Sequence, residues 1–129
     1  MVLALGENCR LGVDIETCRP RANLPALVEK CFAETEAAWW RSLPETEKIR
    51  AFYRFWTRKE ALVKADGRGI ALGLSRCVIN PENPATWLSV PASCEPASAW
   101  HVRDLDMGET ICGALVADKA IAGVRLISS

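Results

Sequence analysis

The longest helical stretch of the sequence, Glu45–Asp66, most constrains what this chain can fold into. Pro44 directly precedes it and Gly67 directly follows it, and these residue types commonly bound a helix. Phe52, Phe55 and Trp56 stand at spacings that are typical of residues facing a core. We therefore expect one long helix whose aromatic side chains are mostly buried.

Shorter elements are predicted on both sides of this helix. Proline and glycine clusters separate them, and the apolar runs between the clusters have strand-like composition. The expected helices are Pro25–Ala33 and Glu34–Ser42, and the expected strands are Val2–Leu5, Leu11–Glu16, Leu74–Ile79, Thr86–Val90, Trp100–Leu105, Ile111–Ala117 and Val124–Ile127. Helices grouped early and an antiparallel meander of strands later predict the α+β class, with an antiparallel sheet packed against the long helix.

The segment Leu11–Glu16 alternates apolar and polar residues, which is typical of a strand. Successive side chains of a strand point to opposite faces, so Asp14 and Glu16 share one face and Val13 and Ile15 share the other. Two neighbouring carboxylates repel each other, and a bound cation is a common remedy. Taken alone, however, both acids are better explained as solvent-facing residues of a half-exposed strand.

The second polar group lies within the long helix. Trp56, Glu60 and Lys64 follow one another at spacings of four residues, so they share one helix face. A strand with two acids and a helix with a third acid and a lysine would suit Mg²⁺ holding a phosphate ester, because Mg²⁺ prefers carboxylate and phosphate oxygens. The alternative is an ordinary surface pair between Glu60 and Lys64, with Arg58 and Lys59 solvating the outer face.

Composition is typical of one compact domain covering residues 1–129, with 50% hydrophobic residues available for a core. Sixteen basic and sixteen acidic side chains cancel, which argues against nucleic acid as a partner. No apolar run approaches the roughly 20 residues of a membrane span. The apolar run at the start, Met1–Leu5, is too short for the core of an export signal and has no basic residue before it. We therefore expect a cytoplasmic protein without a membrane partner.

Six scattered cysteines and one histidine favour reduced, mostly buried thiols over a zinc site.

The two polar segments together resemble the motifs of the 4′-phosphopantetheinyl transferase superfamily. The matching residues are Gly12-Val-Asp-Ile-Glu16, then Phe32-x-x-x-Glu36, then Phe52-Tyr-Arg-Phe-Trp-Thr-Arg-Lys-Glu-Ala-Leu-Val-Lys-Ala-Asp-Gly-Arg-Gly69. In this order and spacing they are similar to the second half of the surfactin-type members. The resemblance covers nearly the whole chain and implies one lobe of that family's usual two-lobed pseudo-dimer.

The resemblance also implies a chemistry. The family transfers the 4′-phosphopantetheine group of coenzyme A to a serine of an acyl or peptidyl carrier protein, releasing 3′,5′-ADP. It implies that Asp14, Glu16 and Glu60 bind Mg²⁺ and that Glu60 and Lys64 act in catalysis. It further implies that Lys59, Lys64 and Arg19 contact coenzyme A. The general base would be Glu60 or a water that it orients.

The length departs from this pattern. Surfactin-type enzymes are about twice as long, and this chain begins where their second half begins, so we expect a fragment, a truncated homologue or a homo-oligomer. An open, partly apolar face should remain where the other lobe packs, with Glu16 and Glu60 near it. Two alternatives remain: a degenerate, non-catalytic half-domain that acts as a binding module, and a magnesium-dependent nuclease.

Overall fold

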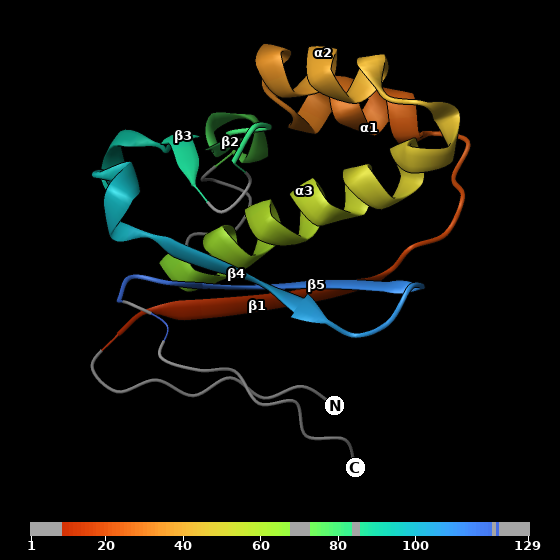
Figure 1. Ribbon diagram of the computed structural model, residues 1–129. Coiled ribbons are helices and arrows are strands. Elements are labelled where there is room, and N and C mark those ends of the chain that lie inside the picture. Colours follow the sequence, from red (N-terminus) through yellow and green to blue (C-terminus); the bar gives the residue numbers. More distant parts are fainter. Residues whose placement is uncertain (1–8, 68–72, 84–85, 120, 122–129) are drawn as a thin grey trace.

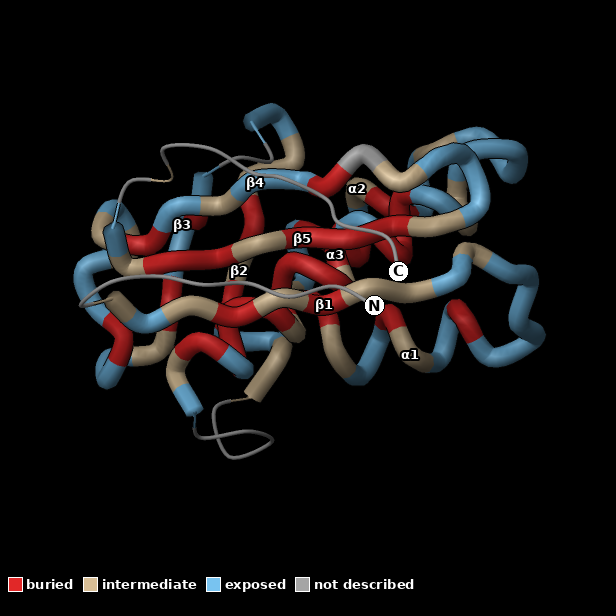
Figure 2. Tube along the Cα trace, turned by 90° about the horizontal axis from the view of Figure 1, so that it is seen from below, coloured by how far each residue is buried: buried red, intermediate tan, exposed pale blue. Residues whose placement is uncertain are grey.

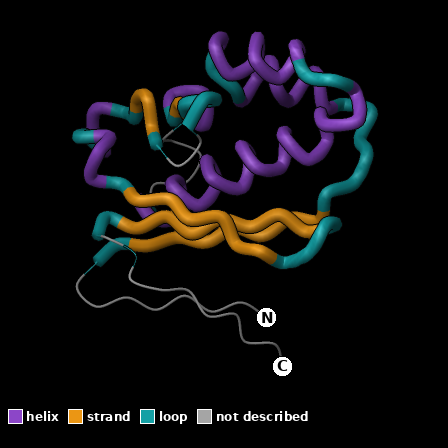
Figure 3. Tube along the Cα trace, in the orientation of Figure 1, coloured by secondary structure: helices purple, strands orange, loops and turns teal. Residues whose placement is uncertain are grey.

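The computed structural model describes residues 9–67, 73–83, 86–119 and 121, and it has three layers. An antiparallel sheet forms the first layer, the long helix α3 crosses one face of it, and two shorter helices cover the opposite side of α3 (Figures 1 and 3). The sheet has the strand order β1-β5-β4. Its strands are β1 (Leu11–Thr17), β5 (Ile111–Ala117) and β4 (His101–Asp106), and the helices are α1 (Leu24–Cys31), α2 (Glu34–Ser42) and α3 (Glu45–Asp66). The predicted α+β class is thereby confirmed.

The sheet packs very closely against α3 at Gly12. The inner face of β1 carries Gly12 and Asp14, and Asp14 stands opposite Ala114 of β5. A Cβ atom built on Gly12 would overlap the carbonyl oxygen of Ala61 and would lie 2.5 Å from the backbone nitrogen of Ala65. Only glycine fits here, since any side chain would push the strand away from the helix. The strand therefore rests directly on the backbone of α3.

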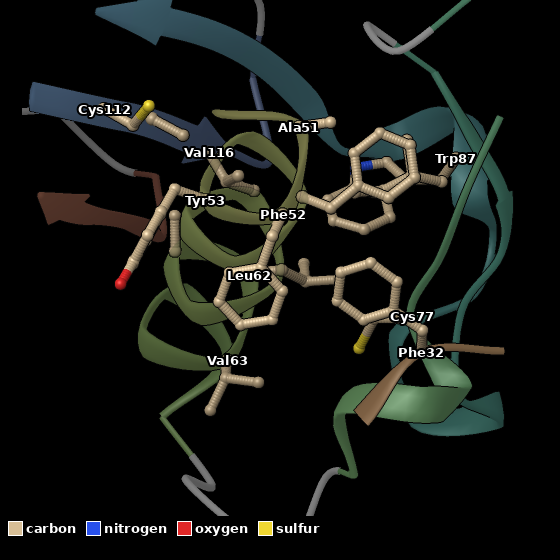
Figure 4. Close-up of a cluster of buried hydrophobic side chains, with 14 of the residues drawn as sticks. Phe32, Ala51, Phe52, Tyr53, Leu62, Val63, Cys77, Trp87, Cys112 and Val116 are labelled. Atoms are coloured by element: carbon tan, nitrogen blue, oxygen red, sulfur yellow. The ribbon is translucent and has the colours of Figure 1, made fainter. Parts of the chain in front are cut away.

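Aromatic side chains join α3 to the layer above it. The ring of Phe32 stacks on Phe52 with centroids 5.6 Å apart, and Trp39 of α2 stacks on Phe55 at 4.8 Å. Figure 4 shows Phe32, Phe52 and Trp87 within one buried cluster. Phe52 and Phe55 are buried and Trp56 is half-buried, as the spacing in the sequence predicts.

A buried ion pair between Glu36 and Lys59 connects α2, α3 and the segment that follows α3. The carboxylate of Glu36 accepts hydrogen bonds from the ammonium of Lys59 at 2.6 Å and from the backbone nitrogen of Ile79 at 2.8 Å. Lys59 also donates to the carbonyl oxygens of Leu74 and Cys77, at 2.9 and 2.6 Å. Both charged side chains are 0% exposed. Burial lowers the pKa of Lys59, and the nearby carboxylate of Glu36 opposes that shift.

We expected Lys59 either to contact coenzyme A or to be solvated on the outer face of the helix. Its buried position agrees with neither expectation. Every donor of its ammonium is already used inside the core, so the side chain has none left for a ligand. Arg58 is buried as well, and its guanidinium forms a two-pronged pair with Asp104 of β4. The two residues therefore stabilise the packing of α3.

The later strands also differ from the prediction. Residues Leu74–Arg76 form a turn of 3-10 helix, η2, and only Val78–Ile79 remain as strand β2. The carbonyl oxygens of Leu74 and Cys77 are turned towards Lys59, which disfavours an extended strand over this segment. β2 pairs with β3 (Trp87–Ser89) in a separate two-stranded sheet, and β1 pairs with β5, so the late strands do not form one meander. The expected strands Val2–Leu5 and Val124–Ile127 lie outside the described residues. Within the described residues, no helix combines the length and apolar character needed to cross a membrane.

Removing one partner of the buried pair should destabilise the fold strongly. Glu36→Gln leaves the ammonium of Lys59 without a counter-charge in the core, and we expect a loss of about 3–5 kcal/mol of unfolding free energy. Glu45→Gln is the matched control, because Glu45 also pairs with a lysine but is 88% exposed. That substitution should cost about 1 kcal/mol or less. Urea unfolding measures both, and equal losses would contradict the assigned role of Glu36.

Candidate functional site

Three carboxylates lie near one another where the edge strand β1 faces α3. Asp14 and Glu16 come from the helix-facing side of β1, and Glu60 comes from α3. The pKa of Glu60 is raised, first by burial and then by the negative charge of Asp14, while Lys64 lowers it and Glu16 raises it further. The site thus concentrates negative charge that Lys64 compensates only in part.

Asp14 is the most buried of these acids and is only 6% exposed. Its Oδ1 accepts a hydrogen bond from the ammonium of Lys64 at 2.7 Å. Its Oδ2 is buried and has no hydrogen-bond partner among the described residues. Lys64 therefore pairs with Asp14 rather than with Glu60, unlike the surface pair that the spacing alone suggested. A buried carboxylate oxygen without a partner is costly, and a bound cation would satisfy it.

A cavity of about 650 Å³ opens beside Glu60 and Lys64. It lies between α1, α3 and the segment around η2, and much of its wall is apolar. Its lining residues are Lys30, Cys31, Glu60, Val63, Lys64, Gly67, Gly73, Leu74 and Ser75. Lys30 was not identified from the sequence, because only the packing of α1 beside α3 brings it to the same cavity as Lys64.

Arg19 lies elsewhere, at a smaller depression of about 350 Å³ that it shares with Glu16, Arg21 and Tyr53. The hydroxyl of Tyr53 donates to the carbonyl oxygen of Arg19 at 3.1 Å and so holds the start of this loop against α3. The structure thus brings Arg19 beside Glu16, while Glu60 and Lys64 line the larger cavity. The sequence assigned Arg19 and Lys64 to contacts with one coenzyme A, whereas these two residues line different hollows.

The donor chemistry of the site fits a hard cation. Carboxylate oxygens are the ligands that Mg²⁺ prefers, and Asp14 supplies one oxygen without a partner. Among the described residues, however, no three histidine, cysteine or acidic side chains are already arranged to hold a metal ion. A cation would have to share Asp14 with Lys64 and draw Glu16 and Glu60 towards it. We also expected Glu16 and Glu60 near an open, partly apolar face. Glu16 lies on the helix-facing side of β1 and Glu60 on α3, so neither is on the outer face of the sheet.

The mutual repulsion of the carboxylates can be tested without any ligand. Asp14→Asn removes the negative charge beside Glu60 and frees Lys64, so the pKa of Glu60 should fall, yet stay above its usual value because burial persists. Glu16→Gln should lower the same pKa by less. Carbon-13 NMR titration of the Glu60 carboxyl measures both shifts. An unchanged Glu60 pKa in Asp14→Asn would show that these carboxylates do not form one site.

Comparison with known proteins gives concordant matches. The model of the 4′-phosphopantetheinyl transferase superfamily matches residues 10–119. The 4′-phosphopantetheinyl transferase HetI of a Nostoc species is 39% identical over 84 residues, covering 64% of this chain and 35% of HetI. AcpT, a 4′-phosphopantetheinyl transferase of Salmonella typhimurium, is 31% identical over 108 residues, covering 74% of this chain and 56% of AcpT. The chain thus spans about a third to just over half of these relatives.

A solved structure has the same fold. The crystal structure of a holo-(acyl-carrier-protein) synthase from Bacillus anthracis, in complex with CoA (3′,5′-ADP), superposes with a TM-score of 0.66. The match covers 83% of this chain and 92% of the synthase at 18% sequence identity. At this identity the likeness establishes the fold.

Proposed function

The chain belongs to the 4′-phosphopantetheinyl transferase superfamily, and on that premise we propose that its site transfers 4′-phosphopantetheine from coenzyme A to a serine of an acyl or peptidyl carrier protein. The observation that carries this proposal is that Glu60 and Lys64 line a cavity of about 650 Å³ while Lys64 also pairs with Asp14. Carboxylates beside a lysine suit a substrate that carries a diphosphate, because both the anion and its metal counter-ion find partners there.

Lys64 would contact a diphosphate oxygen of coenzyme A. Its side chain is 51% exposed, so its ammonium can turn from Asp14 towards a ligand in the cavity. Lys30 of α1, which lines the same cavity, would add a second positive charge. The apolar lining between them would accept a less polar part of the substrate. Arg19 would act from the neighbouring depression, on coenzyme A or on an acidic carrier protein.

Asp14, Glu16 and Glu60 would together hold Mg²⁺, which when bound would neutralise charge on the diphosphate. Glu60, or a water that it orients, would also accept the proton of the attacking serine hydroxyl. In the metal-free chain, the raised pKa of Glu60 makes it a stronger base than an ordinary glutamate, and bound Mg²⁺ would oppose that shift. The same raised pKa lets protons compete with the metal, so Mg²⁺ affinity should weaken as the pH falls through the pKa of Glu60.

A binding module without transferase activity is the second candidate. The burial of Lys59 favours it, because this lysine was expected to contact coenzyme A and is instead paired with Glu36 inside the core. Such a module would bind Mg²⁺ or coenzyme A but would leave a carrier protein unmodified. Family membership leaves the nuclease alternative without support. The cytoplasmic location stays a prediction.

The decisive assay incubates the chain with coenzyme A, Mg²⁺ and an apo carrier protein, followed by intact mass measurement of the carrier. We expect the carrier to gain one phosphopantetheine group. Glu60→Gln should slow the transfer by about 10²-fold or more, as loss of an electrostatic catalytic group does. Lys64→Ala should raise the coenzyme A concentration that is required.

Glu47→Gln is the control for that assay, since Glu47 is an exposed acid on the same helix and outside the site. It should leave the rate unchanged. Binding of coenzyme A with no modified carrier would favour the binding module, and equal rates for Glu60→Gln and Glu47→Gln would refute the assigned role of Glu60.

We propose, in addition, that the lobe associates with a second copy of itself through the outer face of the sheet. Val13 and Ile15 of β1 and Leu115 of β5 are half-buried on this face, which Figure 2 views from below. Light scattering should detect a dimer or trimer, and Val13→Glu should shift it to monomer. Leu88→Glu, which changes an exposed leucine of β3, should not. A monomer at high concentration would contradict this arrangement.

A further inference from the structure

Two cysteines meet where β1 ends beside β5. Cys18 directly follows β1, and its backbone nitrogen donates to the carbonyl oxygen of Thr110 at 2.7 Å, which continues the pairing beyond the strand. Cys112 lies on β5 (Figure 4), and its partner in β1 is Glu16. The two Sγ atoms are 2.7 Å apart. Because side chains alternate along a strand, Cys18 and Glu16 share a face, and Cys18 becomes the diagonal neighbour of Cys112.

The other cysteines have different surroundings. The thiol of Cys77 faces the carbonyl oxygen of Gly73 at 3.6 Å, and that of Cys94 faces the carboxylate of Asp66 at 3.4 Å. All six cysteines are free thiols, and those of Cys18 and Cys112 lie in direct contact.

We propose that Cys18 and Cys112 form a reversible disulfide when the folded chain meets a peroxide. A disulfide bond is about 2.05 Å long, so the sulfur atoms need a movement of well under one ångström. This movement is small enough for side-chain rotation at the end of a strand, where β1 passes into the loop that carries Arg19.

The exposure of the two thiols sets the order of the reaction. Cys18 is half-buried and Cys112 is only 4% exposed. Cys18 would attack the peroxide first, taking one oxygen as a sulfenic acid and releasing one water from hydrogen peroxide. The sulfur of Cys112 would then attack that sulfenic sulfur, forming the disulfide and releasing a second water. Two thiols and one peroxide thus give one disulfide and two waters, and a thiol reductant reverses the bond.

The bond would connect positions 94 residues apart in the sequence. A cross-link over such a long loop restricts the unfolded chain, so the oxidised protein should melt at a higher temperature than the reduced protein. It would also fix the end of β1 that carries Glu16, next to the depression of Arg19 and Arg21. Any effect on transfer rests on the proposed function, but the disulfide itself does not.

The test oxidises the folded, full chain with hydrogen peroxide, blocks the remaining thiols by alkylation and maps the digested peptides by mass spectrometry. We expect a cross-linked peptide pair containing Cys18 and Cys112, lighter by two hydrogen atoms. The melting temperature should rise on oxidation and return after reduction. These readouts require no coenzyme A, metal or carrier, so their failure is separate from a failure of the proposed function.

Variants identify the partners in this test. Cys18→Ser and Cys112→Ser should each abolish both the cross-linked peptide and the rise in melting temperature. Cys9→Ser is the matched control, since Cys9 is also half-buried and should leave both unchanged. Cross-links between other cysteines, or full alkylation of Cys18 and Cys112 after peroxide treatment, would overturn the proposal. If Cys112→Ser fails to fold, Cys18→Ser alone decides, because Cys18 lies outside the buried core.

Discussion

Gly12 has no side chain at the point where β1 crosses the backbone of α3, and the geometry of the site depends on that contact. The strand rests on Ala61 and Ala65, one turn apart on the helix. Asp14, the next inward residue of the strand, then reaches the ammonium of Lys64. A bulkier residue at position 12 would separate the strand from the helix and draw Asp14 away from Lys64. A backbone contact therefore determines how the charged groups meet.

On its other side, α3 is held by the buried pair of Glu36 and Lys59. Because Lys59 binds the carbonyl oxygens of Leu74 and Cys77, it fixes the segment that forms one wall of the large cavity. Glu36 fixes α2, and the aromatic stacking fixes the end of α1. The cavity beside Glu60 is thus bounded by elements that the core positions rigidly, so a ligand would find much of its site already formed.

Local patterns in the sequence predicted the elements that depend on local physics. The bounds of α2, α3 and β5 agree with the prediction, and Asp14 and Glu16 share a strand face as the alternation requires. Residues whose surroundings depend on distant packing were harder to predict. Lys59 resembles any helix lysine until Glu36 is brought to it from 23 residues away. Lys30 similarly has no sequence signal, since only the packing of α1 brings it to the cavity.

The central claim is that Asp14, Glu16 and Glu60 form one cation site. Mn²⁺ can replace Mg²⁺ at an oxygen site, and it broadens the NMR signals of nearby nuclei. Titration of the labelled chain with Mn²⁺ should therefore broaden the signals of these three residues first, and excess Mg²⁺ should restore them. Broadening centred instead on the exposed acids Glu45 and Glu47, or spread evenly over the surface, would contradict the account.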